Sequence, residues 1–144
     1  MSRAGYRFLL HVAPRIDKLL MPRTRGRLSS TGIDKVGLVT TLGAKSGLRR
    51  VHPLVLIDDG DGLLAIGSNY GRAPHPGWSH NLLANPDCDV EYRGPIAPYR
   101  AELLTGAARD GAWTTAVDFY AGYERYRSTA APREIRVFRL RPRG

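Results

Sequence analysis

The sequence predicts a small, mainly β (α+β) barrel of about six antiparallel strands with flanking helices. Short apolar runs alternate with turns rich in Gly, Asp and Pro along much of the chain, as in strands joined by hairpins. With 144 residues, of which 42% are apolar, the chain can bury one sizeable core. We therefore expect one domain, residues 31–144, preceded by a helical segment, residues 1–30.

Residues 1–30 predict a basic amphipathic helix. Its apolar residues recur at helical spacing and are Phe8, Leu9, Val12, Ile16, Leu19 and Leu20. Residues 1–50 hold eleven Lys and Arg against two Asp, an excess equal to the net charge of the whole chain, +9, which favours an anionic partner. The segment is too short and too charged to span a bilayer. Either it packs on the domain, or it lies on a membrane with its basic residues toward lipid phosphates.

The expected strands follow in order. The first two are "KVGLVTTL" and "LRRVHPLVLID", and a turn at residues 58–62 leads into "LLAIGSN". The segments "DCDVEYR" and "YRAELLTG" flank the turn "GPIAP" and predict another hairpin. The last segment, "REIRVFRL", alternates apolar residues with arginines, which predicts a partly exposed final strand.

Two helices are expected among these strands. The short one, "PGWSHNLLANP", has Pro76 at its start and Pro86 beyond its end. The longer one, roughly residues 109–128, places Trp113, Val117 and Tyr120 on one face.

Several function classes lack their sequence signals. The chain has neither GxxxxGK[ST] nor GxGxxG after a strand, and no nucleophile-elbow pattern. Its single cysteine, Cys88, excludes an internal disulfide and favours a cytoplasmic protein. The four histidines have no carboxylate or cysteine at metal spacing, so we expect no metal. Only Tyr6 and Phe8 lie among the cations of residues 1–50, too few aromatic rings to favour a nucleic-acid partner.

Two loops carry the positive signals. The loop "GAKSG" offers backbone N–H groups, the Ser46 hydroxyl and the Lys45 charge, and Arg50 opens the next strand, a combination that suits a phosphate. The alternative is a hairpin whose cations are merely solvated. The second loop, "GSNYGRAPHPGWSHNL", ends in Trp78 at the start of a helix whose N-terminal N–H groups can receive an anion. Trp78 either walls a flat ring or anchors the core.

Three segments together resemble the deazaflavin-dependent nitroreductase family: "LVTTLGAKSGLRRVHPLVL", "GSNYGRAPHPGWSHNLLANP" and "FYAGYERYRSTAAPREIRVFRL". The resemblance spans about residues 36–140 in family order and spacing. It implies an FMN-binding-like split β-barrel that binds coenzyme F420. It also implies an oxidoreductase that transfers hydride from reduced F420 to a quinone, a nitroaromatic or a related unsaturated acceptor.

The resemblance also assigns residues. The implied cofactor-binding residues are Lys45, Ser46, Gly47, Arg50, His52, Pro53, Ser68, Asn69, Gly77, Trp78 and Asn81. The implied catalytic residues are Ser68, Tyr120, Tyr123 and Tyr126. A tyrosine is neutral at pH 7 and can donate a hydrogen bond or proton to the acceptor, while Ser68 polarises it. Alternatively, the tyrosines form an aromatic stripe that packs a helix.

Departures from the family pattern keep other interpretations open. Ala44 stands where many relatives carry arginine, Arg136 replaces a common proline, and Tyr70 replaces a frequent glycine. The alternatives are a non-catalytic deazaflavin-binding protein and an FMN-dependent oxidoreductase on the same barrel. The preferred acceptor is a quinone, collected at the inner face of the cell membrane through residues 1–30. The sequence does not specify an oligomeric state.

Overall fold

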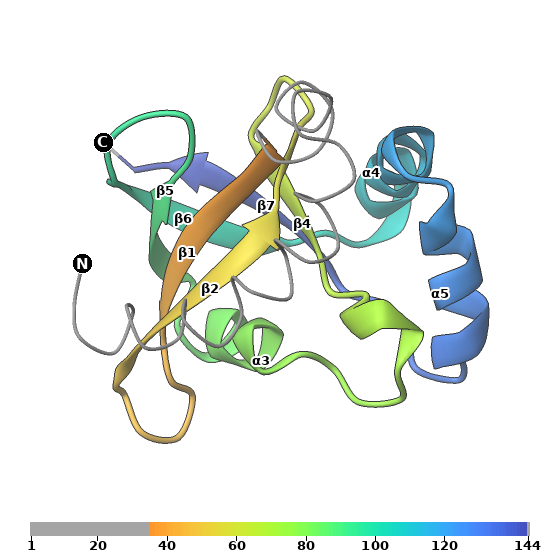
Figure 1. The fold of residues 1–144 in the computed structure, drawn as a ribbon, viewed down its shortest axis with the longest axis horizontal. Coiled ribbons are helices and arrows are strands. Elements are labelled where there is room, and N and C mark those ends of the chain that lie inside the picture. Colours follow the sequence, from red (N-terminus) through yellow and green to blue (C-terminus); the bar gives the residue numbers. More distant parts are fainter. Residues whose placement is uncertain (1–34, 144) are drawn as a thin grey trace, which may run out of the picture.

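An antiparallel sheet of seven strands forms the body of the protein in the computed structural model, which describes residues 35–143 (Figure 1). The helix expected in residues 1–30 lies outside the described residues. The strands are β1 (Val36–Leu42), β2 (Arg49–Val55), β3 (Ile57–Asp58), β4 (Leu63–Ile66), β5 (Asp87–Glu91), β6 (Ala97–Leu103) and β7 (Val137–Pro142). The expected hairpins β1–β2, β3–β4 and β5–β6 are all confirmed.

The order of the strands explains why the sheet curls into a barrel. That order is β2-β1-β5-β6-β7-β4-β3, so the two edge strands are consecutive in the chain. Only Leu56 separates them, and its side chain is fully buried in the core. The two edges of the sheet must therefore approach each other, which makes a split barrel. Residues 48–58 were expected to form one strand, but they form both edge strands, so the sheet has seven strands where about six were expected.

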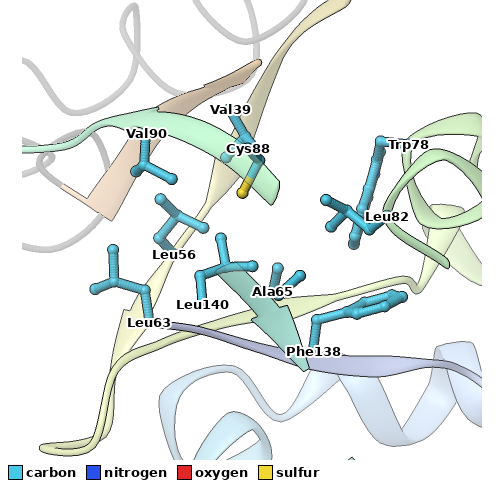
Figure 2. Close-up of a cluster of buried hydrophobic side chains, with 11 residues drawn as sticks. Val39, Leu56, Leu63, Ala65, Trp78, Leu82, Cys88, Val90, Phe138 and Leu140 are labelled. Atoms are coloured by element: carbon cyan, nitrogen blue, oxygen red, sulfur yellow. The ribbon is translucent and has the colours of Figure 1, made fainter. Parts of the chain in front are cut away.

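Alternate residues of β4 supply two separate cores. Leu63 and Ala65 point into the barrel and pack with Leu140 (Figure 2). Leu64 and Ile66 face the other side of the sheet and belong to a second apolar cluster. All four β4 residues are buried because both faces of this strand are covered.

The final strand, β7, is partly exposed, as its sequence predicts. It lies between β6 and β4, with Val137 in the outer cluster and Phe138 in the barrel core. Both side chains are almost completely buried. The expectation of a partly exposed strand is confirmed, because Arg139 is partly buried and Arg141 and Pro142 are exposed, while helices cover the first part of the strand (Figure 1).

Within residues 35–143, three α-helices and one 3₁₀ turn accompany the sheet: α3 (Gly77–Ala84), α4 (Gly106–Phe119), α5 (Gly122–Ala130) and η2 (Asn69–Gly71). The short predicted helix is confirmed as α3, with Pro76 at its N-cap. The longer one is divided into α4 and α5, which corrects the expectation of a single helix. Tyr120 is extended at the break, and its ring lies so close to Gly122 that a Cβ there would meet it at 2.3 Å. At the break the Tyr120 ring therefore lies against the first residue of α5.

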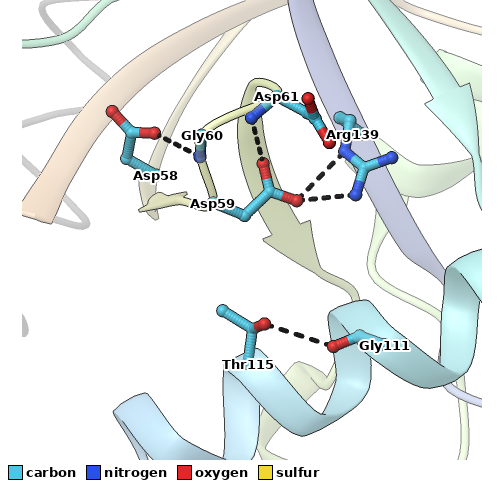
Figure 3. Close-up of polar contacts among 7 residues, drawn as sticks. All are labelled: Asp58, Asp59, Gly60, Asp61, Gly111, Thr115 and Arg139. Atoms are coloured by element: carbon cyan, nitrogen blue, oxygen red, sulfur yellow. Dashed lines mark hydrogen bonds and ion pairs between the residues drawn. The ribbon is translucent and has the colours of Figure 1, made fainter.

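A buried ion pair fixes the turn between β3 and β4 to β7. Arg139 donates from Nε and Nη2 to one oxygen of Asp59, at 3.1 and 2.6 Å (Figure 3). The other Asp59 oxygen accepts the Asp61 N–H. The two side chains of the pair are 12% and 8% exposed. Because both charges are buried, removal of either side chain would leave the other charge buried without a partner.

Candidate active site

The β1–β2 loop is a tight, locally ordered turn. Gly43 donates its N–H to the Leu48 carbonyl, and Gly47 donates to the Gly43 carbonyl, each at 2.8 Å. The Ser46 hydroxyl accepts the Leu48 N–H at 3.1 Å. Gly47 has φ +70, and nothing lies within 4 Å of where its Cβ would be. The loop therefore holds its shape through its own hydrogen bonds while its outer side stays open.

Cations surround this loop, but they are not equivalent. Arg49 donates to Asp89 on β5 at 3.0 Å. Lys45 and Arg50 are exposed, and no carboxylate within residues 35–143 forms an ion pair with either. Two charges are consequently available to an anion. Many relatives carry an arginine at the position of Ala44. Because Arg49 is already paired with Asp89, it does not supply the charge that this arginine would provide.

A buried chain of hydrogen bonds ties the loop to α3 and β2. The Ala44 N–H donates to Asn81 Oδ1 at 2.9 Å, and Asn81 Nδ2 donates to Thr41 Oγ1 at 2.9 Å. The same Thr41 oxygen shares a hydrogen bond with His52 Nε2 at 3.1 Å. Asn81, predicted to bind the cofactor, thus fixes the loop from below. Local sequence gave no signal that Thr41 joins this chain.

His52 is held neutral by its surroundings. Burial, together with the charge of Arg50 two residues away on the same strand, lowers its pKa to about 4. Side chains two apart on a strand share a face, so His52 and Arg50 point to the same side as Thr41. At neutral pH this face of β2 carries one positive charge, that of Arg50. Pro53 lies next to it on an edge strand, where its missing N–H is tolerated.

The second predicted loop has an unusual backbone. Asn69, Tyr70 and Gly71 are consecutive residues with positive φ, at 47, 57 and 74 degrees. Asn69 donates from Nδ2 to the Pro74 carbonyl at 2.9 Å, which closes the loop internally. The Tyr70 ring is 62% exposed. A non-glycine residue in this conformation is strained, so Tyr70 is a costly choice at a position where glycine fits.

Gly71 shows why the loop needs a residue without a side chain. A Cβ here would lie 2.0 Å from Thr129 Oγ1 and 3.0 Å from the Tyr126 Cα of α5. The Thr129 hydroxyl instead donates to the Gly71 carbonyl at 2.9 Å. Helix α5 therefore packs directly on the backbone that follows Ser68.

Arg133 holds the same loop from the other side, and sequence reasoning missed it. Its guanidinium donates to the carbonyls of Gly67, Ser68 and Arg72 at 2.7 to 3.1 Å. A fifth, longer contact joins its Nη1 to His75 Nδ1 at 3.5 Å. All five N–H groups thus face acceptors. The signal was weak because Arg133 lies 61 to 66 residues from the carbonyls it binds.

The three predicted tyrosines are brought together, but in different environments. Their ring centroids are 5.2 to 6.3 Å apart. Tyr123 is 7% exposed and packs on Trp113 in the outer core, and burial raises the pKa of its hydroxyl well above the usual range. Tyr120 is 45% exposed, and its hydroxyl lies 3.5 Å from that of Tyr126. This hydrogen bond, with burial, raises the pKa of Tyr126 to about 12.

Residues around the start of α3 occupy the space between the two loops (Figure 1). Trp78 is 7% exposed, and its ring packs on Phe138 at 5.8 Å between centroids. Its side chain is therefore a core anchor. Gly77 is exposed, with nothing within 4 Å of a built Cβ, so the first turn of the helix is open. Among residues 35–143, no three His, Cys, Asp or Glu side chains are grouped to hold a metal ion.

Within the part of the chain that the structure describes, no helix is long and apolar enough to cross a bilayer.

Comparison with known proteins identifies the family. Residues 15–142 match the family model described as F420H(2)-dependent quinone reductase. The chain belongs to this family. Membership makes it an oxidoreductase with coenzyme F420 as its cofactor, and confirms the resemblance stated from the sequence.

Individual members of the F420H2-dependent quinone reductase family are similar along much of the chain. A Mycobacterium tuberculosis protein provisionally named as such a reductase is 35% identical over 69% of this chain and 82% of its own length. Another reductase of that species is 36% identical, but the match spans about half of each protein. A solved structure of an F420-H2 dependent reductase is 34% identical, with a TM-score of 0.67, over 74% of this chain and 93% of that one.

The residues present fit the cofactor of this family. Coenzyme F420 carries a phosphate and an oligoglutamate tail, so its site must offer unpaired cations. Lys45 and Arg50 have no ion-pair partner among residues 35–143, and they lie on or beside a loop whose backbone is already ordered. Helix α3 links this loop to the tyrosine cluster through Asn81 at one end and the 67–76 loop at the other.

Proposed function

We propose that this chain transfers hydride from reduced coenzyme F420 to a quinone, with Lys45 and Arg50 holding the anionic part of the coenzyme. The observation that carries this assignment is the pair of exposed cations, without ion-pair partners among residues 35–143, on a loop braced by Asn81. An anion bound there replaces solvent around two charges and gains charge-assisted hydrogen bonds. The wider implied set, including Gly47, Asn69 and Gly77, supports a contact surface along the same side of α3.

The coenzyme, when bound, supplies the hydride, and the protein supplies geometry and protons. Quinone reduction needs one hydride and one further proton. We assign that proton to the Tyr126 hydroxyl, because it is protonated at neutral pH and, unlike Tyr123, is only partly buried. Tyr120, hydrogen-bonded to Tyr126 and half exposed, passes a replacement proton from water. Tyr123 packs the cluster, and Ser68 orients the acceptor from the loop clamped by Arg133.

Cofactor binding provides the first test. We expect F420 to bind the wild-type chain, as followed by quenching of tryptophan fluorescence. The double variant Lys45→Ala, Arg50→Ala should bind about 100-fold more weakly, since each charged hydrogen bond contributes roughly 1.5 kcal/mol or more. Arg49→Ala is the matched control, because that neighbouring charge is already paired with Asp89. Equal loss in the control, or none in the double variant, would move the site away from this loop.

Turnover provides the second test. Oxidation of F420H2, followed by absorbance with a soluble quinone, should fall about 100-fold in kcat for Tyr126→Phe if that hydroxyl is the proton donor. Tyr123→Phe should leave kcat within a factor of three, as expected when a buried ring only packs. An unchanged rate in Tyr126→Phe excludes the proposed donor. Nitroaromatic acceptors, assayed in parallel, decide whether the enzyme also acts as a nitroreductase.

We further propose that residues 1–30 bring the enzyme to anionic membranes, where lipid-soluble quinones reside. The support is the excess of positive charge in the first fifty residues together with the amphipathic pattern. Flotation with phosphatidylglycerol-containing vesicles should carry the full chain upward, and a chain lacking residues 1–30 should stay below. Absence of flotation for the full chain would leave the enzyme to act on quinones away from membranes.

A further inference from the structure

Tyr70 occupies a costly backbone conformation without a gain in core packing. Its φ of 57 and ψ of 27 degrees lie in the left-handed region, which glycine adopts freely and residues with a side chain do not. Tyr70 is also 62% exposed and belongs to neither apolar cluster. Glycine would therefore serve the fold better at this position. Strained residues of this kind gather at ligand sites, and the exposed ring is the part of Tyr70 that a ligand can reach.

Two neighbours hold the Tyr70 ring in place. The Cζ atom of Arg72 lies over the ring, 5.7 Å from its centroid, as in a cation–π pair. The ring of Tyr126, on α5, meets it nearly at right angles, with centroids 6.4 Å apart. The Arg72 carbonyl is itself fixed, because it accepts two hydrogen bonds from Arg133. The Tyr70 ring is therefore positioned before a ligand arrives, which reduces the entropy that binding would cost.

Tyr70 extends the exposed side of the tyrosine cluster. The Tyr126 ring contacts the rings of both Tyr70 and Tyr120, at 6.4 and 6.0 Å between centroids. Tyr70 and Tyr120 are exposed, and Tyr126 is partly exposed. The turn η2 and helix α5, which carry Tyr70 and Tyr126, lie side by side (Figure 1). Two distant parts of the chain thus build one accessible aromatic surface, and Ser68 lies only two residues from Tyr70.

We propose that Tyr70 is a specificity-determining residue for the acceptor, whose ring packs on a planar, fused-ring quinone and favours it over a single-ring quinone. This role rests on the proposed reduction of quinones. The Tyr70 and Tyr126 centroids are 6.4 Å apart, which is more than the width of one six-membered carbon ring. A second fused ring lets the acceptor contact Tyr70 while its quinone ring stays beside Tyr126. Quinones are planar and electron-poor, so they stack favourably on an electron-rich tyrosine ring.

Two fully substituted quinones form a matched pair of acceptors: 2,3-dimethyl-1,4-naphthoquinone and tetramethyl-1,4-benzoquinone. They share the quinone ring and differ in the fused benzene ring, which replaces two methyl groups. Every carbon of the quinone ring is substituted in both, so neither adds to the thiol of Cys88. Oxidation of F420H2 by the full chain gives kcat and KM for each acceptor. The ratio of the two kcat/KM values measures the preference and cancels their difference in reactivity when variants are compared.

Variants of Tyr70 show whether the ring sets this preference. Tyr70→Leu removes the aromatic ring but keeps a bulky side chain, and thus the same strained backbone. We expect the preference for the naphthoquinone to fall about tenfold, mainly through KM, as the loss of one aromatic contact implies. Tyr70→Phe, the conservative variant, should restore it, because the ring and not the hydroxyl makes the contact. Ile96→Ala, which removes an exposed apolar side chain between β5 and β6, should leave the preference unchanged. Equal preferences in Tyr70→Leu and the wild type overturn the proposal.

Direct binding of the naphthoquinone separates this role from the redox function. Equilibrium dialysis with the F420-free full chain should show weaker binding to Tyr70→Leu than to Tyr70→Phe. If the wild type oxidises F420H2 with neither quinone, the proposed function fails, and dialysis alone decides the role of Tyr70. Weaker binding to Tyr70→Leu then supports the proposal, and equal binding to the two variants overturns it.

Discussion

The β1–β2 loop and the 67–72 loop both face the candidate site, yet they differ in how much they depend on remote parts of the chain. The first is shaped by hydrogen bonds between residues two to five apart, plus one bond from Asn81. The second also has local bonds, such as that from Asn69 to the Pro74 carbonyl, but it is held in addition by Arg133 and Thr129, which lie 58 to 66 residues away. The first loop can therefore lose its side-chain charges without losing its shape. The second depends on remote partners, and we expect substitutions there to affect stability as well as activity.

Gly71→Ala should give the largest effect. The new Cβ overlaps Thr129, approaches the backbone of α5 and requires φ +74. We expect a loss of about 4 kcal/mol of unfolding free energy in urea, from overpacking, backbone strain and a lost hydrogen bond. Gly111→Ala, in α4 with open space around a built Cβ, is the control and should gain about 1 kcal/mol. Similar losses in both variants would mean that α5 does not rest on this loop.

The network under the first loop should appear as a pH dependence. The folded pKa of His52, about 4, lies below its unfolded value of 6.5. As the pH falls from 6.5 toward 4, the unfolded state takes up the proton first, so stability is lost, by about 3 kcal/mol at pH 4. Urea unfolding of wild-type and His52→Asn chains across this range measures the difference. Parallel pH profiles would show that His52 is not held neutral.

Arg133→Gln separates the two loops most cleanly. It removes the donors that bind three carbonyls, and we expect a loss of about 2 kcal/mol. Hydrogen exchange should accelerate at residues 67–72 and stay unchanged at residues 43–48. Arg125→Gln, an exposed charge on α5, should alter neither. Faster exchange in both loops would contradict their independence.

Tyr70 should give the smallest effect. Its φ of 57 favours glycine, so Tyr70→Gly should be about 1 kcal/mol more stable than Tyr70→Ala, which keeps the strained backbone but loses the ring. Thermal denaturation of the two variants makes the comparison. If Ala is tolerated as well as Gly, the backbone at this position is not strained.

Much of the fold and part of the site follow from local patterns in the chain. The hairpins, the bounds of α3 and the barrel class were predicted, because turns and capping prolines act over a few residues. The cations Lys45 and Arg50 were singled out for the same reason. The family resemblance added the remaining site residues, and the comparisons confirm the family while the residue roles stay predictions.

Other features depend on contacts between distant segments. The position of β7 between β6 and β4 and the clamp by Arg133 both join parts of the chain far apart in sequence. From the sequence, an arginine at an alternating position of a strand is expected to be exposed. In the structure Arg139 is instead mostly buried, because it forms an ion pair with the buried Asp59. Local patterns specify which segments become strands and which cations a loop displays, since both follow from neighbouring residues. Burial, pairing and pKa depend on which surfaces meet, and the packed barrel alone sets them.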